Sequence, residues 1–312
     1  MGRISVPVIQ SNGDEDLVEI FGANAERFKA LYQETGVVLF RNFKKSHYSF
    51  MNEICPIIFT ETMNQTGRHT AREKREGAVH TSTAKNKNAV IVQHSESAYL
   101  PSFPSSLLFH CVTAARVGGR TPISSLEYLT QQIPEAIKAK VSEEGVRYVR
   151  RMGTVPGHEW QTVYRTDDAD ALTQKLLSED TEVEWEGDVL ITTRQLPGFI
   201  KSVGTSASFW FNALYSSNAL TIPQAQLDFL IANFGADKLP NTTYYGSGEA
   251  LPQHDFVQIE RAYRQSTAAF DWQDGDLLWL DNLRYAHGRE AFDGDREVLV
   301  ILGDPKNWAD LV

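Results

Sequence analysis

Three residues from two distant parts of the chain could bind one metal ion together. His94 and Glu96 lie in the segment NAVIVQHSESAYL, and His287 follows the apolar run GDLLWL much later in the sequence. Side chains two residues apart on an extended strand share a face, so His94 and Glu96 are expected to point toward one spot while Ser95 points away. An imidazole and a carboxylate placed in this way can occupy two positions on a divalent metal.

Two histidines and one acid on one side of a metal leave its other coordination positions open, which is the arrangement of non-haem Fe(II) oxygenases. An H-x-E pattern alone is weak support, because His and Glu are common residues. The apolar runs AVIVQ and LLF on either side place the pattern in a largely buried sheet. A buried imidazole and carboxylate are unfavourable unless something pairs them, and a divalent cation is one such partner. His287 by itself could equally be a structural or an exposed histidine in a tight segment that emerges from a strand.

Hydrophobic spacing in the first sixty residues predicts the elements that precede this site. Apolar residues at helical intervals predict a helix over 14–34, which Gly36 ends. The run GVVLFRNF, residues 36–43, predicts a buried strand. Ser46 is the predicted N-cap of a second helix through Ile54, and Pro56 closes that region.

The rest of the chain combines short strands with a few helices, which predicts a mostly β protein with helical decoration, of the α+β class. No internal repeat or Pro/Gly-rich linker divides the sequence, so residues 1–312 are expected to form a single domain with insertions around 150–250. The predicted elements are helices at 134–144 and 223–234, a short helix capped by Asp167 or Asp168, strands at 145–152, 270–280 and 297–302, and a hairpin that turns at 186–188.

Residues 60–88 are polar and are predicted to form a mobile surface loop. His69 and His80 lie in this loop, and the solvated surface is the expected place for both. Long loops between strands also carry lids and substrate contacts, so residues 68–83 are candidates for binding a substrate, as is Tyr99.

Composition excludes several classes of protein. The net charge of −10 argues against a nucleic-acid surface. Cys55 and Cys111 are the only cysteines, which indicates a reducing compartment rather than a disulfide framework. Neither a signal peptide nor a membrane-spanning segment is expected from the sequence, so a cytoplasmic location is predicted.

Several motifs together resemble one enzyme family. The segments HSESAY, PSSLLFHC, GGRTPISS, FWFNAL, GDLLWLDNLRYAHGREAF and DREVLVILGD are similar to the taurine dioxygenase and clavaminate synthase-like family of Fe(II)/2-oxoglutarate oxygenases. Within that family they most resemble the branch that hydroxylates amino-acid-like groups in natural-product pathways. The resemblance extends from Gly36 to Asp304, and it implies a double-stranded β-helix, or jelly-roll, core.

The resemblance implies roles for individual residues. His94, Glu96 and His287 match the iron triad, with Glu where many relatives have Asp. Related halogenases have a small residue at the acid position, so Glu96 argues for hydroxylation or a related oxidation. Trp210 and Asn212, in FWFNAL, resemble a motif near the active-site wall, although aromatic residues also commonly fill cores.

Binding of the cosubstrate is also implied by matching residues. Thr121, in GGRTP, matches the threonine that hydrogen-bonds the 2-oxoglutarate carboxylate, although a turn residue after two glycines is the alternative. Arg296 matches the arginine that pairs with the distal carboxylate through two parallel donors. Arg289 competes for that role, or instead holds the loop.

The implied activity consumes Fe(II)-activated O2 and 2-oxoglutarate, releases succinate and CO2, and hydroxylates an amino-acid-derived small molecule in secondary metabolism. The substrate is expected to be free or bound to a carrier protein, and desaturation or cyclisation would begin in the same way. Two alternatives remain from the residues alone. Two His and one Glu can also form a hydrolytic zinc site, and a β-barrel binding protein without catalytic activity is the third possibility.

Overall fold

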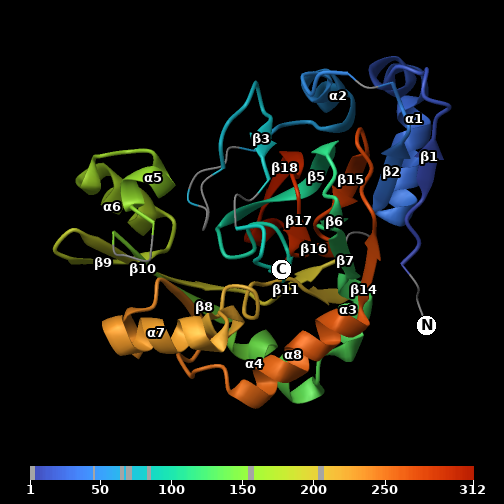
Figure 1. Ribbon diagram of the computed structural model, residues 1–312. Coiled ribbons are helices and arrows are strands. Elements are labelled where there is room, and N and C mark those ends of the chain that lie inside the picture. Colours follow the sequence, from blue (N-terminus) through green and yellow to red (C-terminus); the bar gives the residue numbers. More distant parts are fainter. Residues whose placement is uncertain are drawn as a thin grey trace.

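Two β-sheets that share a hydrophobic core form the centre of the protein (Figure 1). The computed structural model describes residues 4–44, 46–63, 67, 72–82, 86–153, 158–202 and 207–312. The large sheet contains, in spatial order, β1 (Val8–Gln10), β2 (Val37–Arg41), β15 (Leu277–Asp281), β5 (Ser102–Thr113), β18 (Glu297–Asn307) and β3 (His80–Thr81). The small sheet contains β14 (Thr267–Phe270), β7 (Thr121–Ser125), β16 (Tyr285–Arg289) and β4 (Ile91–His94).

Strand β5 shows why the large sheet has two apolar faces. Leu107 and Phe109 point into the core shared with the small sheet, where they meet Ile123 of β7. Leu108 points to the opposite face, which is covered by the N-terminal helices. Successive side chains alternate between the faces of a strand, so a strand buried on both sides is a continuous apolar run.

Helix α1 (Leu17–Thr35) confirms the first predicted helix. The Asp16 carboxylate accepts hydrogen bonds from the backbone N–H groups of Val18 (2.9 Å) and Glu19 (3.3 Å) at its start. Gly36 ends it with a φ of 70°, a left-handed conformation that glycine adopts without steric cost. The predicted strand that follows is β2.

Helix α2 (Phe50–Ile58) corrects the second predicted helix. It begins at Phe50, with Ser49 rather than Ser46 at its N-cap, and Pro56 lies inside it instead of closing it. Its apolar side chains at Phe50, Met51 and Ile54 are buried against the large sheet. Packing of this face outweighs the one hydrogen bond that a proline removes from the helix.

Further helices cover the other side of the molecule, at the bottom of Figure 1. They are α3 (Leu126–Gln132), α4 (Glu135–Glu144) and α8 (Gln253–Gln265). Helix α4 confirms the helix predicted at 134–144, although Pro134 is its N-cap and not its first residue. Helix α8 was not predicted, although Phe256, Ile259 and Tyr263 form a buried stripe at helical spacing.

Residues 146–245 build a second antiparallel region, in which β13, β8, β10 and β9 form one sheet, extending to the left of Figure 1, and β11 and β12 form a separate pair. The β9–β10 hairpin turns at Gly187-Asp188, and Asp168 caps α6 by accepting from the Ala171 N–H at 2.8 Å, so both predictions are confirmed. The elements are β13 (Asn241–Tyr245), β8 (Val146–Met152), β10 (Val189–Leu196), β9 (Glu182–Glu186), β11 (Phe199–Lys201), β12 (Ser208–Trp210), α5 (Trp160–Tyr164), α6 (Ala169–Ser178) and α7 (Gln224–Phe234). Short 3-10 helices span Ala219–Thr221, Ala236–Lys238 and Trp308–Asp310.

The single strand predicted at 270–280 is confirmed only over 277–280, because the chain changes sheets within the predicted range. Strand β14 belongs to the small sheet and β15 to the large one. The turn between them is fixed by the buried carboxylate of Asp276, which pairs with Arg41 at 2.6 Å and accepts from the Gln273 N–H. The remaining two strands, β6 (Val117–Gly118) and β17 (Phe292–Asp293), pair with each other.

The described parts of residues 60–88 include ordered contacts with the large sheet. His80 lies on β3 and is 7% exposed, so its predicted place on the solvated surface is wrong. It pairs with Val300 of β18, and the alternation of the edge strand turns its ring inward. His69 lies outside the described residues, and mobility of this segment stays a prediction. Among the helices described, none has the length and apolar character that a membrane span requires.

His110 is expected to make the protein less stable as the pH falls from about 7 to about 4. Burial lowers the pKa of its imidazole from 6.5 to about 4. Between these values the unfolded state binds more protons than the folded state, so acid favours unfolding by about 1–3 kcal/mol. His110→Asn retains a donor for the carbonyl of Asp276 and should flatten this pH dependence, as measured by urea unfolding at pH 7.5 and 5.0. His158→Asn, at an exposed position, is the control. An equal loss of unfolding free energy between pH 7.5 and 5.0 in His110→Asn and His158→Asn would show that His110 does not cause the pH dependence.

Candidate metal centre

His94 and His287 face each other across two neighbouring strands. They are directly paired in the antiparallel ladder of β4 and β16, and their ring centroids are 4.6 Å apart. The register shifts just after His287, where Gly288 lies against the opposite strand. A Cβ at Gly288 would lie 2.6 Å from the carbonyl oxygen of Ile91, so only glycine permits this approach. His287 lies within a strand, not in the predicted segment emerging from one.

Glu96 reaches the histidines from a turn and not from the predicted strand. Strand β4 ends at His94, and the chain then turns, with Ser97 in the left-handed region at a φ of 61°. The buried amide of Asn282 holds this turn: its Oδ1 accepts from the Glu96 N–H at 2.7 Å. Its Nδ2 donates to the carbonyl oxygens of Glu96 (3.1 Å) and Pro104 (2.7 Å). The alternation argument was therefore wrong about how the side chains converge.

The three side chains fit a divalent metal. One ligand atom from each of His94, Glu96 and His287 lies within 4.8 Å of the others, and His287 Nε2 is 3.7 Å from Glu96 Oε2. The Nδ1 of His94 lies 3.0 Å from the carbonyl oxygen of Val92. A proton on Nδ1 would satisfy that carbonyl and leave Nε2 as the ligand, which is how backbone groups orient metal-binding histidines.

A buried arginine holds the carboxylate of the triad. Arg72 Nη2 donates to Glu96 Oε2 at 2.8 Å, and both side chains are 5% exposed. This is the same oxygen that faces His287. Arg72 lies in the 68–83 segment that the sequence marked for substrate contact, but nothing in the sequence indicated a contact with Glu96.

Thr121 and Arg296 line the same pocket as the two histidines. The indole Nε1 of Trp272 donates to Thr121 Oγ1 at 2.9 Å, so the threonine hydroxyl has its own proton to donate elsewhere. Arg296 Nε donates to the carbonyl oxygen of Gly119 at 3.0 Å. Burial, and to a smaller extent the nearby charge of Arg289, lower the pKa of Arg296 to about 10.

Arg289 also lines the pocket but is anchored to the neighbouring loop. Its Nη2 donates to the carbonyl oxygens of Asn86 and Ala89, both at 2.8 Å. These two contacts match the alternative in which Arg289 holds the loop.

The other residues singled out from the sequence lie elsewhere. Trp210 and Asn212 are buried in the core beside the helices, and Asn212 Nδ2 donates to the carbonyl oxygen of Gly198 at 2.8 Å. Tyr99 is buried as well, with the guanidinium of Arg150 5.7 Å from its ring. None of the three is among the described residues that line the metal pocket.

One family model and two known proteins match most of this sequence. The family model described as "Taurine catabolism dioxygenase TauD, TfdA family" matches residues 9–302. The dapdiamide synthesis protein DdaC of Enterobacter agglomerans is 30% identical over 299 residues, which are 96% of this chain and 90% of DdaC. A clavaminate synthase-like protein of Arabidopsis thaliana is 26% identical over 289 residues, covering 88% and 83% of the two chains.

Several solved structures share this fold at low sequence identity. PvcB of Pseudomonas aeruginosa has a TM-score of 0.52 and 16% identity, covering 95% of this chain and 84% of PvcB. AAD-2 in complex with Mn(II) and N-oxalylglycine has a TM-score of 0.53 and 11% identity, covering 97% and 95%. The family model matches most of the chain, and His94, Glu96 and His287 form a facial triad. This chain therefore belongs to the TauD/TfdA family of non-haem Fe(II)/2-oxoglutarate oxygenases.

Proposed function

We propose that the protein hydroxylates an amino-acid-derived small molecule in secondary metabolism, free or bound to a carrier protein, with decarboxylation of 2-oxoglutarate to succinate. The observation that carries this proposal is the convergence of His94, Glu96 and His287 beside a pocket lined by Thr121 and Arg296. DdaC supports a natural-product setting, since it is named for dapdiamide synthesis. PvcB is described as an Fe, alpha-ketoglutarate dependent oxygenase from an isonitrile synthetic pathway.

We also propose that the core of the protein is a double-stranded β-helix. The large and small sheets pack face to face across one core and would form the double-stranded β-helix, within a single domain over residues 1–312. Residues 146–245 would then be an insertion that leaves this core intact. The small sheet positions His94 on β4 and His287 on β16, whereas Asn282 holds the turn after β4 that carries Glu96.

The proposed mechanism assigns one task to each residue. His94, His287 and Glu96 would hold Fe(II) through two nitrogens and one oxygen. The bound iron and 2-oxoglutarate together activate O2 to oxidise a C–H bond of the substrate. The buried walls of the pocket exclude water, and the side chains fix the positions of the reactants. The contact between His94 Nδ1 and the Val92 carbonyl would keep the first ligand in one orientation.

Thr121 and Arg296 would bind the two ends of 2-oxoglutarate. Because Trp272 already donates to its oxygen, the Thr121 hydroxyl would donate its proton to a carboxylate. One edge of the Arg296 guanidinium contacts Gly119 through Nε, so the terminal nitrogens would form a paired contact with the distal carboxylate. Arg289 already donates from Nη2 to two backbone carbonyl oxygens, so it is the weaker candidate for binding the distal carboxylate of 2-oxoglutarate.

Replacing Arg296 with lysine is expected to raise the KM for 2-oxoglutarate by about 10- to 100-fold, because lysine cannot form two parallel hydrogen bonds with a carboxylate. The measurement is succinate formation at varied 2-oxoglutarate concentration. Arg289→Lys is the matched control and should change this KM less. A larger increase in Arg289→Lys than in Arg296→Lys would exchange the two roles.

Product analysis tests the function as a whole. Protein supplied with Fe(II), ascorbate and 2-oxoglutarate is incubated with a panel of free and carrier-loaded amino acids, and products are identified by mass spectrometry. Hydroxylation predicts a product heavier by one oxygen atom, with succinate in equal amount, whereas desaturation or cyclisation predicts the loss of two hydrogen atoms. Conversion that does not require 2-oxoglutarate, and is supported by zinc alone, would contradict the proposal and favour a hydrolase.

A further inference from the structure

The strand that carries His94 has little of its own to fix its position. Strand β4 is four residues long and lies at the edge of the small sheet, where β16 is its one neighbour among the described strands. His94 is its last residue, and the chain turns directly after it. A slip of one residue along β16 would turn the His94 ring to the other face of the sheet. Contacts besides the ladder must therefore help to hold this strand.

A β-bulge lies immediately before His94. Between the two places where β4 and β16 are in register, β16 contributes one residue, Gly288, and β4 contributes two, Val92 and Gln93. The extra residue of a bulge is left out of the ladder, and the bulge bends the strand and changes where its side chains point. The Val92 carbonyl oxygen lies 3.0 Å from His94 Nδ1. The same bulge therefore supplies the group that orients the His94 ring.

The side chain of Gln93 connects this bulge to the far half of the small sheet. Its Nε2 donates to Ser124 Oγ on β7 at 2.9 Å and to Thr267 Oγ1 on β14 at 2.5 Å. Strand β16 lies between β4 and β7, so the contact extends across a whole strand. A side-chain amide has two N–H donors, and both are used here.

The two hydroxyl groups that accept from Gln93 are themselves held in place. The Thr267 hydroxyl donates to the carbonyl oxygen of Tyr263, in the last turn of α8, at 2.6 Å. This leaves the Thr267 oxygen to accept from Gln93. Ser124 is fully buried, and its Oγ lies 3.1 Å from Thr267 Oγ1. The Gln93 amide thus anchors the bulge to a fixed part of the protein.

This anchor and the metal ligands lie on opposite faces of the small sheet. The His287 ring faces the large sheet, where its centroid is 5.2 Å from that of Phe109. The hydroxyl groups that bind Gln93 lie on the other face, beside the carbonyl of Tyr263 on α8. Gln93 is not among the described residues that line the metal pocket. Any effect of Gln93 on the metal must therefore pass through the backbone that carries His94.

We propose that Gln93 is a positioning residue for the metal centre. Its amide holds the bulge in the one arrangement in which the Val92 carbonyl orients the His94 ring toward the metal. This inference rests on the assignment of His94 as a ligand, and it is independent of which small molecule is oxidised. Without the amide, β4 would keep its ladder with β16 but lose its polar contacts with β7 and β14. The ring of His94 would then be less well oriented, and metal affinity would fall in a protein that still folds.

Mn(II) alone serves as the probe, and the free ion is measured by electron paramagnetic resonance during a titration. Gln93→Leu has a similar size and lacks both donors. It should raise the Kd for Mn(II) by about tenfold, as expected when a contact behind a metal ligand is lost. Thr267→Val removes one of the two acceptors and should raise the Kd by a smaller factor. Thr267→Ser keeps the hydroxyl group and should restore the wild-type Kd.

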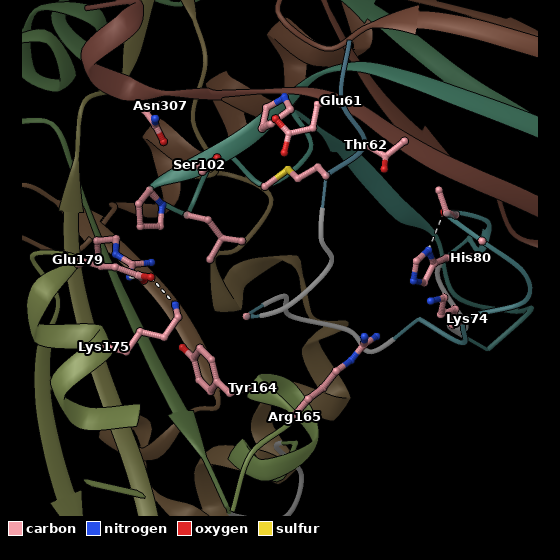
Figure 2. A pocket seen from close by; sticks show the side chains of 18 residues that line it. Glu61, Thr62, Lys74, His80, Ser102, Tyr164, Arg165, Lys175, Glu179 and Asn307 are labelled. Atoms are coloured by element: carbon pink, nitrogen blue, oxygen red, sulfur yellow. Dashed lines mark hydrogen bonds and ion pairs between the residues drawn. The ribbon is translucent and has the colours of Figure 1, made fainter. Parts of the chain in front are cut away.

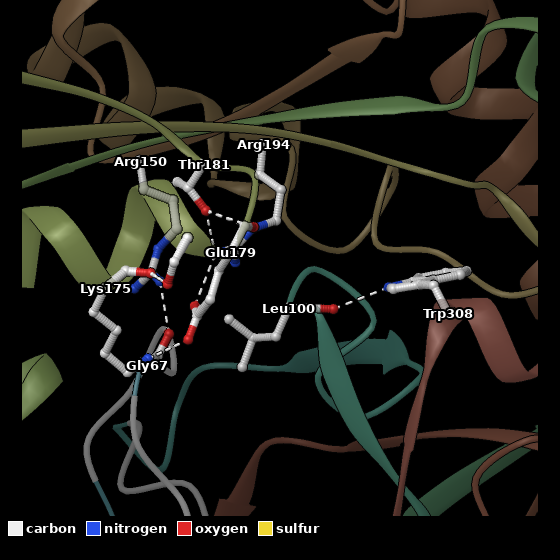
Figure 3. Close-up of polar contacts among 9 residues, drawn as sticks. Gly67, Leu100, Arg150, Lys175, Glu179, Thr181, Arg194 and Trp308 are labelled. Atoms are coloured by element: carbon white, nitrogen blue, oxygen red, sulfur yellow. Dashed lines mark hydrogen bonds and ion pairs between the residues drawn. The ribbon is translucent and has the colours of Figure 1, made fainter.

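Thr181→Val is the matched control, because Thr181 Oγ1 also accepts two hydrogen bonds from one side chain. The donors are Nε (3.0 Å) and Nη2 (2.5 Å) of Arg194, in the cluster shown in Figure 3. Arg194 lies on β10, outside the small sheet, and lines a cavity of about 710 Å³ beside α5 and α6 (Figure 2). Thr181→Val should therefore lower the free energy of unfolding and leave the Kd for Mn(II) unchanged.

Urea unfolding shows which variants are folded under the conditions of the titration. A wild-type Kd in folded Gln93→Leu, or an equal increase in Thr181→Val, would overturn the inference. If Gln93→Leu does not fold, the pair at position 267 decides, and equal Kd values in Thr267→Val and Thr267→Ser would overturn it. Wild-type protein that binds no Mn(II) would refute the metal centre itself, a failure that is distinguishable from a failure of Gln93 alone.

Discussion

Replacing Glu96 with alanine is expected to lower 2-oxoglutarate-dependent succinate production by about 10³-fold or more, because the site loses its one carboxylate ligand. The ligand atoms of Glu96, His94 and His287 converge within 4.8 Å, and among the described residues no second acid belongs to this group. The substitution also removes the buried partner of Arg72 and leaves a positive charge where a metal should bind. Metal affinity should fall together with turnover.

Glu96→Asp is the control for this experiment, since it keeps the charge and shortens the side chain by one methylene. It should retain measurable activity and metal, because a carboxylate remains beside the two histidines. Succinate release and the iron content of the purified variants are the two measurements. Wild-type turnover in Glu96→Ala would show that the carboxylate is not a ligand.

Replacing Asn282 with alanine is expected to lower the free energy of unfolding by roughly 2–5 kcal/mol, because it leaves several buried backbone groups without hydrogen bonds. The Asn282 amide is fully buried and pairs with both the N–H and the carbonyl of Glu96 and with the carbonyl of Pro104. The turn that carries Glu96 should loosen, so metal affinity should also decrease.

Urea unfolding and metal titration of Asn282→Ala measure these two effects. Asn233→Ala is a suitable control, because Asn233 is exposed on α7 and its amide makes one bond, to the carbonyl oxygen of Phe229. The control should lose less than about 1 kcal/mol. Wild-type metal affinity in a folded Asn282→Ala protein would show that the turn is positioned by other contacts.

The sequence was sufficient to identify the metal ligands but not the geometry that brings them together. An H-x-E pattern after an apolar run and a distant histidine are visible in the sequence. That His94 and His287 are direct cross-strand partners depends on the register of β4 and β16, which a single chain does not reveal. Glu96 was found by a pattern whose assumed geometry, a continuous strand, is wrong.

Elements with a strong local signal were predicted well. Helix α1 has an acidic N-cap residue and a glycine directly after its C-terminus. The β9–β10 hairpin is joined by a short turn at Gly187-Asp188, and both signals are local in the sequence. The boundary between β14 and β15 was missed, because the aromatic residues before Asp274-Gly275 and the apolar residues after it were interpreted as one strand. The contact of Asp276 with Arg41 at this break joins residues that are distant in the sequence, so no local pattern indicates it.

Residues that support the site were the hardest to predict. Asn282, Trp272 and Arg72 each act on a residue far away in the sequence, at separations of 186, 151 and 24 positions. Asparagine, tryptophan and arginine are common in other roles, so no local pattern distinguishes them. The alternating apolar strands could be recognised, whereas the polar contacts across them could not.

Anaerobic titration of the purified protein with Fe(II) and 2-oxoglutarate, followed by visible absorption, tests the central claim most directly. The account predicts a new absorption band that requires both additions, saturates at one iron per chain and is absent from His287→Ala. A wild-type protein that shows no such band, or a His287→Ala variant that shows it at full intensity, would contradict the account.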